Sequence, residues 1–194
     1  GWLTRSERAR LEGLAAPSRR ATFLAGRWLL RQLLAELFGG SPTEHTAEID
    51  VQGRSSACGG SANISHSGDR FAAAWSPEPI GIDIELLRPR RDLLGLAAGV
   101  HGPAQCAELA LLDDATRLRR FYELWTLKEA TLKREGEGLD MARMRGMDFM
   151  ADRDGDCWSL ALEHEDLALA VVGPLRTPGL PPGVTVIDRL RLKA

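Results

Sequence analysis

Residues 80–85 (IGIDIE) constrain the fold of this chain most, because isoleucines occupy alternate positions and two acids lie between and after them. Successive side chains of a strand point to opposite faces, so the isoleucines share one face while Asp83 and Glu85 share the other. An unbroken isoleucine face predicts burial, and burial makes two neighbouring carboxylates unfavourable unless a cation offsets their charge. On spacing alone, an edge strand with both acids in solvent is an equally good interpretation.

Helical spacing marks a second segment, residues 117–135, in which apolar residues recur every three or four positions and neither Gly nor Pro occurs. Glu129 and Lys133 lie one turn apart and therefore share a face of this helix. If the helix packs across the strand, Glu129 becomes a third acid beside Asp83 and Glu85, and Lys133 supplies a counter-charge for an anion. Taken alone, the two residues would more often form an ordinary surface ion pair.

Three carboxylates without a Cys or His cluster are typical of a site for a hard cation. Mg²⁺ prefers oxygen ligands, takes few protein carboxylates and completes its shell with water and substrate phosphate. We therefore predict that Asp83, Glu85 and Glu129 bind Mg²⁺, with Mn²⁺ as a substitute, and that the substrate carries a diphosphate.

Three motifs carry a resemblance to a known family: NISHSG at 63–68, GIDIE at 81–85 and FYELWTLKEATLK at 121–133. In this order and spacing they resemble the signature motifs of the 4'-phosphopantetheinyl transferases of the surfactin-synthetase-activating type. The resemblance spans roughly residues 19–133. It implies the α+β fold of that family, in which two similar halves each contain antiparallel strands and a long helix, with the active site between them.

The reaction that the resemblance implies is transfer of the 4'-phosphopantetheine arm from coenzyme A to a serine of an acyl or peptidyl carrier protein, with release of adenosine 3',5'-bisphosphate. Such a phosphoryl transfer requires neutralisation of developing charge and uptake of a proton. The implied catalytic residues are Asp83, Glu129 and Lys133. Glu129 takes up the proton, directly or through a water on the metal, and Lys133 stabilises the leaving phosphate. Two alternatives are a Mg²⁺-dependent hydrolase of nucleotide diphosphates and a catalytically silent module that binds carrier proteins.

Basic residues accompany the apolar stripe of a helix predicted over residues 18–38. Composition alone favours a solvated charged face for them, whereas the resemblance implies that they bind the nucleotide end of coenzyme A. Arg54 stands where family members often have the lysine of a Gly-Lys-Pro turn, and Ser65 and His66 belong to the motif that contacts the phosphates. The expected coenzyme A contacts are Arg20, Arg27, Arg31, Arg54, Ser65, His66, Lys128 and Lys133.

A basic, proline-punctuated linker at residues 88–91 (RPRR) predicts a boundary between two halves. We expect an N-terminal half over residues 1–91, with the nucleotide-binding helix and the first two motifs, and a C-terminal half over residues 92–194. The resemblance implies that an acidic carrier protein docks near this linker, although a solvated basic face is an equal interpretation for any single arginine. The arginines expected to steer the partner are Arg88, Arg90, Arg91, Arg117, Arg119 and Arg120.

Local patterns predict the remaining elements. A first helix begins near Thr4 and weakens toward Pro17, and helical or looped apolar segments cover residues 93–98 and 103–112. The turn residues 76–79 (SPEP) predict an antiparallel hairpin of residues 71–75 with 80–85. The other expected strands are residues 49–51, 147–150, 158–162, 167–172 and 184–188, with 158–162 and 167–172 forming a hairpin.

Composition excludes several classes of protein. A net charge of -2 argues against a nucleic-acid partner, and three widely spaced cysteines argue against a disulfide framework or a structural zinc site. No apolar run is long enough for a membrane span and no signal-peptide core is present, so we expect a cytoplasmic protein, monomeric as the family architecture implies. Family members usually begin with an apolar strand, for which only Gly1, Trp2 and Leu3 are present here.

Overall fold

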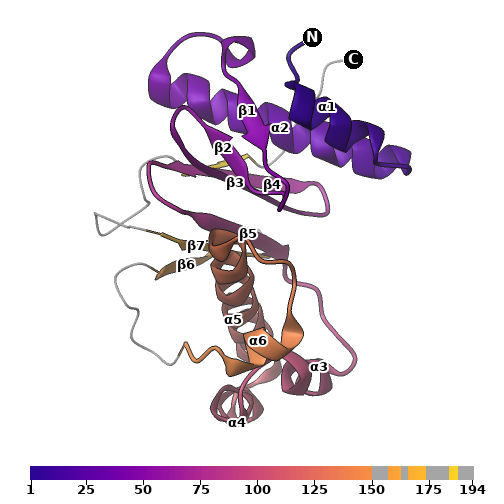
Figure 1. The fold of residues 1–194 in the computed structure, drawn as a ribbon. Coiled ribbons are helices and arrows are strands. Elements are labelled where there is room, and N and C mark those ends of the chain that lie inside the picture. Colours follow the sequence, from indigo (N-terminus) through magenta and orange to yellow (C-terminus); the bar gives the residue numbers. More distant parts are fainter. Residues whose placement is uncertain (150–156, 163–165, 174–183, 188–194) are drawn as a thin grey trace.

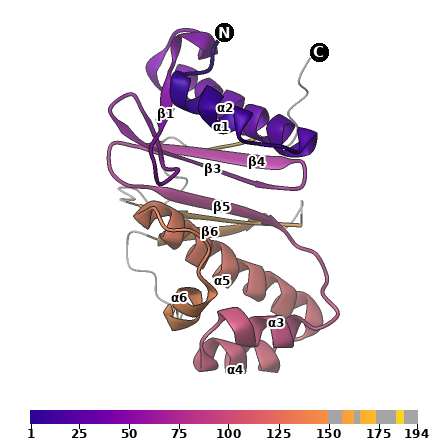
Figure 2. The ribbon, with the colours of Figure 1, turned by 45° about the vertical axis from the view of Figure 1, so that its right-hand side comes forward.

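The protein is built as two stacked sheets between two groups of helices (Figures 1 and 2). The computed structural model describes residues 1–149, 157–162, 166–173 and 184–187. Helices α1 (Arg5–Glu12) and α2 (Pro17–Phe38) cover the outer face of one sheet, and α5 (Asp114–Glu135) covers the outer face of the other. All strand pairs within the described residues are antiparallel. This arrangement confirms the α+β class expected from the sequence.

Helix α2 confirms the apolar stripe predicted over residues 18–38. It begins one residue earlier, at Pro17, because the fixed φ of proline suits the first helical turn. It ends at Phe38 and is capped by Gly39, whose φ is 79°. The preceding helix α1 begins at a capping box in which the Thr4 side chain and Glu7 satisfy each other's backbone amides. The stripe of α2 packs on the first sheet through Ala25, Leu29, Leu30, Leu33 and Leu34.

The first sheet has five strands in the order β1-β2-β3-β4-β8. A short 3-10 helix, η1 (Pro42–Glu44), leads into it from α2. Its strands are β1 (Ala47–Ile49), β2 (Ser55–Ala57), β3 (Gly60–Ser67), β4 (Arg70–Ser76) and β8 (Val184–Ile187). The strands expected at 71–75 and 184–187 are thereby confirmed, whereas the one expected at 49–51 ends at Ile49 and residues 51–53 form a turn; Asp188 lies outside the described residues.

The second sheet has three strands in the order β5-β7-β6, namely β5 (Gly81–Leu86), β7 (Leu167–Val172) and β6 (Cys157–Leu162). The hairpin of β6 with β7 is confirmed. The hairpin predicted between residues 71–75 and 80–85 is wrong, because β4 pairs with β3 and β8 while β5 pairs with β7. Ala72 and Ala74 of β4 instead pack with the isoleucines of β5 in one buried cluster, so residues 76–79 carry the chain from one sheet to the other.

Three shorter helices complete the side of the molecule that contains α5 (Figure 2). They are α3 (Leu93–Val100), α4 (Pro103–Leu111) and α6 (Met141–Gly146). The strand predicted at 147–150 is wrong over residues 147–149, which follow α6 without regular structure, and Met150 lies outside the described residues. Phe149 anchors this irregular segment by packing against the buried side chains of α5 and β7, so its apolar character reflects a packing contact rather than strand pairing.

The two sheets each combine strands from distant parts of the chain. β5 precedes the boundary predicted at residue 91 yet belongs to the sheet of β6 and β7, and β8 belongs to the sheet of the N-terminal strands. A division at residue 91 therefore does not coincide with a division between sheets. Among the helices that the structure describes, none combines the length and apolar character that crossing a bilayer requires.

Candidate active site

The three sequence motifs meet at one cleft of about 260 Å³ between the first sheet and α5. β3 contributes Ile64, Ser65 and His66, β5 contributes Asp83 and Glu85, and α5 contributes Glu129 and Lys133. The prediction that α5 crosses the strand of Asp83 and brings Glu129 and Lys133 beside its acids is confirmed by this lining.

Gly81 explains why α5 can approach β5 so closely. A Cβ at this position would lie 1.8 Å from the Ala130 carbonyl oxygen and 2.7 Å from the Arg134 amide nitrogen. Only the absence of a side chain allows this contact, because backbone atoms cannot move aside as a flexible side chain can. The first residue of the acidic strand is therefore the point at which helix and strand cross.

Lys133 forms its ion pair with Asp83 rather than with Glu129 on its own helix. Its Nζ lies 2.6 Å from Asp83 Oδ1, and it also donates to Ser65 Oγ at 2.9 Å and to the Ile82 carbonyl at 3.3 Å. These contacts match the three donors of an ammonium group. The Lys133 side chain is 27% exposed and the Asp83 side chain only 3%, so the cation lies at the mouth of the cleft and the carboxylate at its floor.

The other two carboxylates of the cleft, Glu85 and Glu129, have raised pKa values, because their surroundings disfavour ionisation. Burial raises the pKa of Glu129 to about 7, and the charges of Asp83 and Glu85 act in the same direction against the opposing effect of Lys133. Burial also raises the pKa of Glu85, which a hydrogen bond from Ser67 lowers in part. The excess of negative charge in a poorly solvated cleft accounts for both shifts.

The residues of the cleft fit a hard cation in their chemistry. Three carboxylates line it, and Asp83 Oδ2 is buried without a hydrogen-bond partner. A buried carboxylate oxygen is normally paired, so this oxygen indicates a missing cation or donor. Across the residues that the structure describes, however, no group of three His, Cys, Asp or Glu side chains is already arranged around a metal position.

A second cleft of about 530 Å³ adjoins the first, and the two share Ile64 and His66 in their linings. Arg10, Arg19 and Arg27 contribute basic side chains to it. The exposed ring of His66 packs edge-on against Phe71 at 5.8 Å, at the junction of the two clefts. An elongated anion with charge at both ends would fit along this path.

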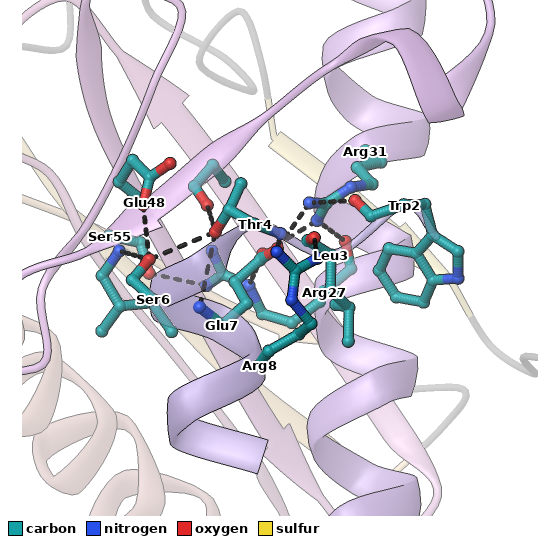
Figure 3. A network of polar contacts seen from close by, with 12 residues as sticks. Trp2, Leu3, Thr4, Ser6, Glu7, Arg8, Arg27, Arg31, Glu48 and Ser55 are labelled. Carbon is teal, nitrogen blue, oxygen red and sulfur yellow. Dashed lines mark hydrogen bonds and ion pairs between the residues drawn. The ribbon is translucent and has the colours of Figure 1, made fainter. Parts of the chain in front are cut away.

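The structure does not place Arg31 at either cleft. Its guanidinium is fully buried and donates to both Glu7 oxygens, at 2.9 and 2.6 Å, and to the Trp2 carbonyl at 3.0 Å (Figure 3). The Trp2 ring covers the guanidinium at 4.8 Å. Arg31 therefore fixes the N-terminal segment onto α2 and is not the coenzyme A contact expected from the sequence.

Two further arginines of α2, Arg20 and Arg27, differ in their position relative to the clefts. Arg27 donates to Glu7 at 2.7 Å and to Ser55 at 2.7 Å, is only 3% exposed, and lines the second cleft (Figure 3). Arg20 donates to the carbonyls of Leu11 and Leu14, and so satisfies the C-terminal end of α1. Of the arginines expected to contact coenzyme A, Arg27 is the one whose position matches.

Lys128 and Arg54 also lie outside the residues that line the two clefts. Lys128 is fully buried, where its Nζ donates to the Val100 carbonyl at 3.0 Å and to Gln105 at 2.7 Å, and burial lowers its pKa to about 8. One step along a helix turns a side chain by about 100°, which rotates Lys128 into the core beside α4 and corrects its expected phosphate contact. Arg54 pairs with Asp50 at 2.7 Å on the surface.

Two residues at or beside the clefts, Ser67 and Arg10, were not assigned a role from the sequence. Ser67 Oγ donates to Glu85 Oε2 at 2.6 Å, and Arg10 lines the second cleft from α1. The signal for Ser67 was available, because polar residues occupy every second position from Ser61 to Ser67. No comparable pattern marks Arg10, whose role depends on how α1 lies over α2.

A third groove of about 560 Å³ lies at the predicted linker and the start of α5. Arg90, Arg91 and Arg117 line it together with Leu93 and Leu94, the latter 41% exposed. Arg120, also expected to steer a partner, is instead paired with Glu108 and Glu123. Asp92 and Asp114 also line the groove, and Asp114 pairs with Arg117 at 2.7 Å, so the groove combines basic and apolar side chains with two acids.

The region in which the long helix α5 crosses β5 beside the carboxylate-lined cleft is similar to a known family. Residues 79–172 match the family model of the 4'-phosphopantetheinyl transferase superfamily. This stretch includes β5, α5 and the four charged residues of the cleft, Asp83, Glu85, Glu129 and Lys133.

Particular relatives carry the same description. The chain is 34% identical over 144 residues to the 4'-phosphopantetheinyl transferase HetI of Nostoc sp. (strain PCC 7120), an alignment that covers 71% of this chain and 61% of HetI. It is 38% identical over 122 residues to AcpT of Salmonella typhi, covering 61% and 60%, and 38% identical over 79 residues to Sfp of Bacillus subtilis, covering 41% and 34%. The chain thus spans less than two thirds of the length of these curated relatives.

Proposed function

We propose that this protein transfers the 4'-phosphopantetheine group of coenzyme A to a serine hydroxyl of an acyl or peptidyl carrier protein and releases adenosine 3',5'-bisphosphate. The observation that carries the proposal is the meeting of three carboxylates and Lys133 in one cleft that adjoins a second, arginine-lined cleft. The names of the relatives, all 4'-phosphopantetheinyl transferases, support the same reaction.

The two adjoining clefts suit the two phosphate-bearing groups of coenzyme A. We place the diphosphate in the first cleft, beside Lys133, and the adenosine 3'-phosphate end in the second, beside Arg19 and Arg27. His66 lies at their junction and can donate to a phosphate from there. Charge-assisted hydrogen bonds from Lys and Arg are the usual means of holding such groups.

The residues of the first cleft would hold a divalent cation, Mg²⁺ or Mn²⁺, through Asp83, Glu85 and Glu129. When bound, such an ion neutralises charge on the diphosphate and orients it for displacement. The buried, unpaired Oδ2 of Asp83 supports this assignment. A bound cation would also relieve the repulsion that raises the pKa values of Glu85 and Glu129.

Glu129 and Lys133 have different roles in the proposed reaction: Glu129 accepts a proton, and Lys133 stabilises negative charge. The Glu129 carboxylate would take up the proton of the attacking serine hydroxyl, directly or through an intervening water. Lys133, whose ammonium group pairs with Asp83 and is partly exposed to the cleft, would stabilise the charge that develops on the phosphate that leaves with the nucleotide.

The carrier protein would dock at the groove of residues 89–94 and 114–118. Arg90 and Arg91 attract an acidic surface, and the half-exposed Leu94 offers an apolar contact beside them, whereas Arg117 is paired with Asp114. α5 runs from this groove to the cleft, since it begins at Asp114 and carries Glu129 and Lys133 toward its other end.

The nucleotide products test the proposal against its two rivals. The protein, Mg²⁺ and coenzyme A are incubated with or without an apo carrier protein, and nucleotides are separated by chromatography. We expect adenosine 3',5'-bisphosphate only when the carrier is present, in amounts equal to the carrier modified. Nucleotide released without a carrier would instead support a diphosphate hydrolase. A carrier that binds without any release would support a silent binding module.

A further inference from the structure

One edge of β5 is satisfied by side chains of β3 instead of by another strand. Within the second sheet β5 pairs with β7 on one side only. On its other side the backbone amides of alternate residues donate to side-chain oxygens of alternate β3 residues. The four rungs are Ile80 to Ser61 at 3.4 Å, Ile82 to Asn63 at 3.2 Å, Ile84 to Ser65 at 3.4 Å and Leu86 to Ser67 at 3.1 Å.

The regular spacing of these rungs shows that they form a single ladder. Each joins residues 19 positions apart in the chain, so the two strands keep the same register along their lengths. Edge amides left without partners are unfavourable when buried and invite pairing with other chains. The polar side chains at every second position of β3 therefore bind the backbone amides at the edge of the second sheet and hold that edge against the first sheet.

The last rungs of the ladder also hold acids of the cleft. Ser67 Oγ accepts from the Leu86 amide and donates to Glu85 Oε2 at 2.6 Å. Ser65 Oγ accepts from the Ile84 amide and donates to Asp83 Oδ1 at 2.7 Å. In both cases one hydroxyl ties a carboxylate to the backbone of the residue that follows it, so the acid and the ladder share an anchor.

We propose that Ser67 is a positioning residue that fixes the Glu85 carboxylate to the β5 backbone for cation binding. The cation-binding part rests on the proposed function, whereas the anchor itself rests on the contacts above. Ser65 is less suited to a test, because it also accepts from Lys133 and lines the cleft. Removing the Ser67 hydroxyl leaves the Leu86 amide and the Glu85 carboxylate without this partner, and lets the carboxylate turn freely.

The chain offers a matched control for this residue. Ser61 forms the first rung of the same ladder, but the amide it accepts belongs to Ile80, which lies between Pro79 and Gly81 and not beside an acid of the cleft. Ser61→Ala therefore removes a rung without removing a carboxylate anchor. Ser67→Thr keeps the hydroxyl and serves as the rescue variant.

The first measurement is amide hydrogen exchange by NMR, without metal or coenzyme A. In Ser67→Ala we expect faster exchange at Leu86 and unchanged exchange at Ile80, and in Ser61→Ala the reverse. Ser67→Thr should protect Leu86 as the parent protein does. Unchanged exchange at Leu86 in Ser67→Ala would overturn the anchor, whatever the protein does with metals.

The second measurement is the affinity for Mn²⁺, followed by the electron paramagnetic resonance of free Mn²⁺ in the presence of coenzyme A. Loss of a side chain that hydrogen-bonds to a metal ligand typically lowers the affinity for the metal by about 10- to 100-fold. We expect a loss in this range for Ser67→Ala. Ser61→Ala should stay within about twofold of the parent, and Ser67→Thr close to it. Equal affinities in all variants would overturn the positioning role. If the parent protein bound no Mn²⁺, the proposed metal site would fail, and the exchange at Leu86 would still decide the anchor.

Discussion

Two groups of charged side chains in this molecule combine acidic and basic residues in opposite proportions. The Glu7 cluster joins one carboxylate to two buried guanidiniums, those of Arg27 and Arg31. The Asp83 cluster joins three carboxylates, those of Asp83, Glu85 and Glu129, to the ammonium of Lys133 at an open cleft. The first is buried and has an excess of positive charge, and only Arg27 of its members lines a cleft. The second has an excess of negative charge at a cleft that a ligand can enter. Access to the solvent and the sign of the excess charge distinguish the two groups.

The largest effect should come from the site itself. Asp83→Asn keeps the shape of the side chain but removes the charge at the floor of the cleft, so transfer should fall by about 10³-fold, equivalent to about 4 kcal/mol of transition-state stabilisation. The free energy of unfolding should change by less than about 1 kcal/mol, because Lys133 can pair with the remaining acids. Steady-state kinetics and urea unfolding measure the two quantities. Retained activity would remove Asp83 from the metal assignment.

The opposite outcome is expected for the buried cluster. Glu7→Ala leaves two buried guanidiniums without their carboxylate, which should lower the free energy of unfolding by about 3–5 kcal/mol. Glu12→Ala on the exposed side of the same helix is the control and should stay within about 0.5 kcal/mol of the parent protein. Urea unfolding of both variants gives the comparison. Equal stability of the two variants would show that the Glu7 contacts contribute nothing.

The pH dependence of stability should have opposite signs in the two clusters. The pKa of Glu129 is raised to about 7, so its contribution to stability is fully present below its ordinary pKa of 4.5 and is lost as the pH rises through 7. Burial opposes ionisation of Glu7, but hydrogen bonds from Arg31, the Thr4 amide and Arg27 lower its pKa overall, so its contribution is lost as the pH falls below 4.5.

Glu129→Gln isolates the first of these effects. With divalent cations chelated, the parent protein should lose about 1–3 kcal/mol of stability relative to Glu129→Gln between pH 4.5 and 7. Denaturant unfolding of both proteins at several pH values measures the difference. A difference that does not vary with pH would contradict the raised pKa of Glu129.

The smallest effect is expected for a surface pair that belongs to neither cluster. Arg54 and Asp50 are bonded at 2.7 Å, but both side chains are well exposed. Arg54→Ala should therefore change the free energy of unfolding by no more than about 0.5 kcal/mol. A KM for coenzyme A that rises in this variant would restore the phosphate contact that the resemblance implies for Arg54.

The parts of the fold that follow from local patterns were predictable from the sequence. The alternation in residues 80–85 and the helical spacing of residues 117–135 gave both elements of the first cleft, and the apolar stripe after Pro17 gave α2. These patterns are decided by neighbours within one or two turns, and the cleft follows once the two elements cross. The crossing itself has a visible sign in Gly81, whose missing side chain admits α5.

Contacts between distant segments were not predictable in the same way. The turn residues 76–79 suggested a hairpin, but the isoleucine face of β5 packs on β4 and its backbone pairs with β7, which follows some eighty residues later. The sequence predicted that Arg31 is available to bind a ligand, because its partner Glu7 lies 24 residues earlier on another helix. Lys128 resembled its neighbours in the motif, although its side chain turns into the core. In each case the deciding partner is outside the local pattern.

The intact mass of an apo carrier protein tests the central claim most directly. The carrier is incubated with this protein, coenzyme A and Mg²⁺, with parallel samples that contain EDTA or the Asp83→Asn variant. We predict a gain of one 4'-phosphopantetheine group with the parent protein, and no gain in either parallel sample. An unmodified carrier with the parent protein, or a modified carrier in both parallel samples, would contradict the assignment of the Asp83 cluster as the transferase site.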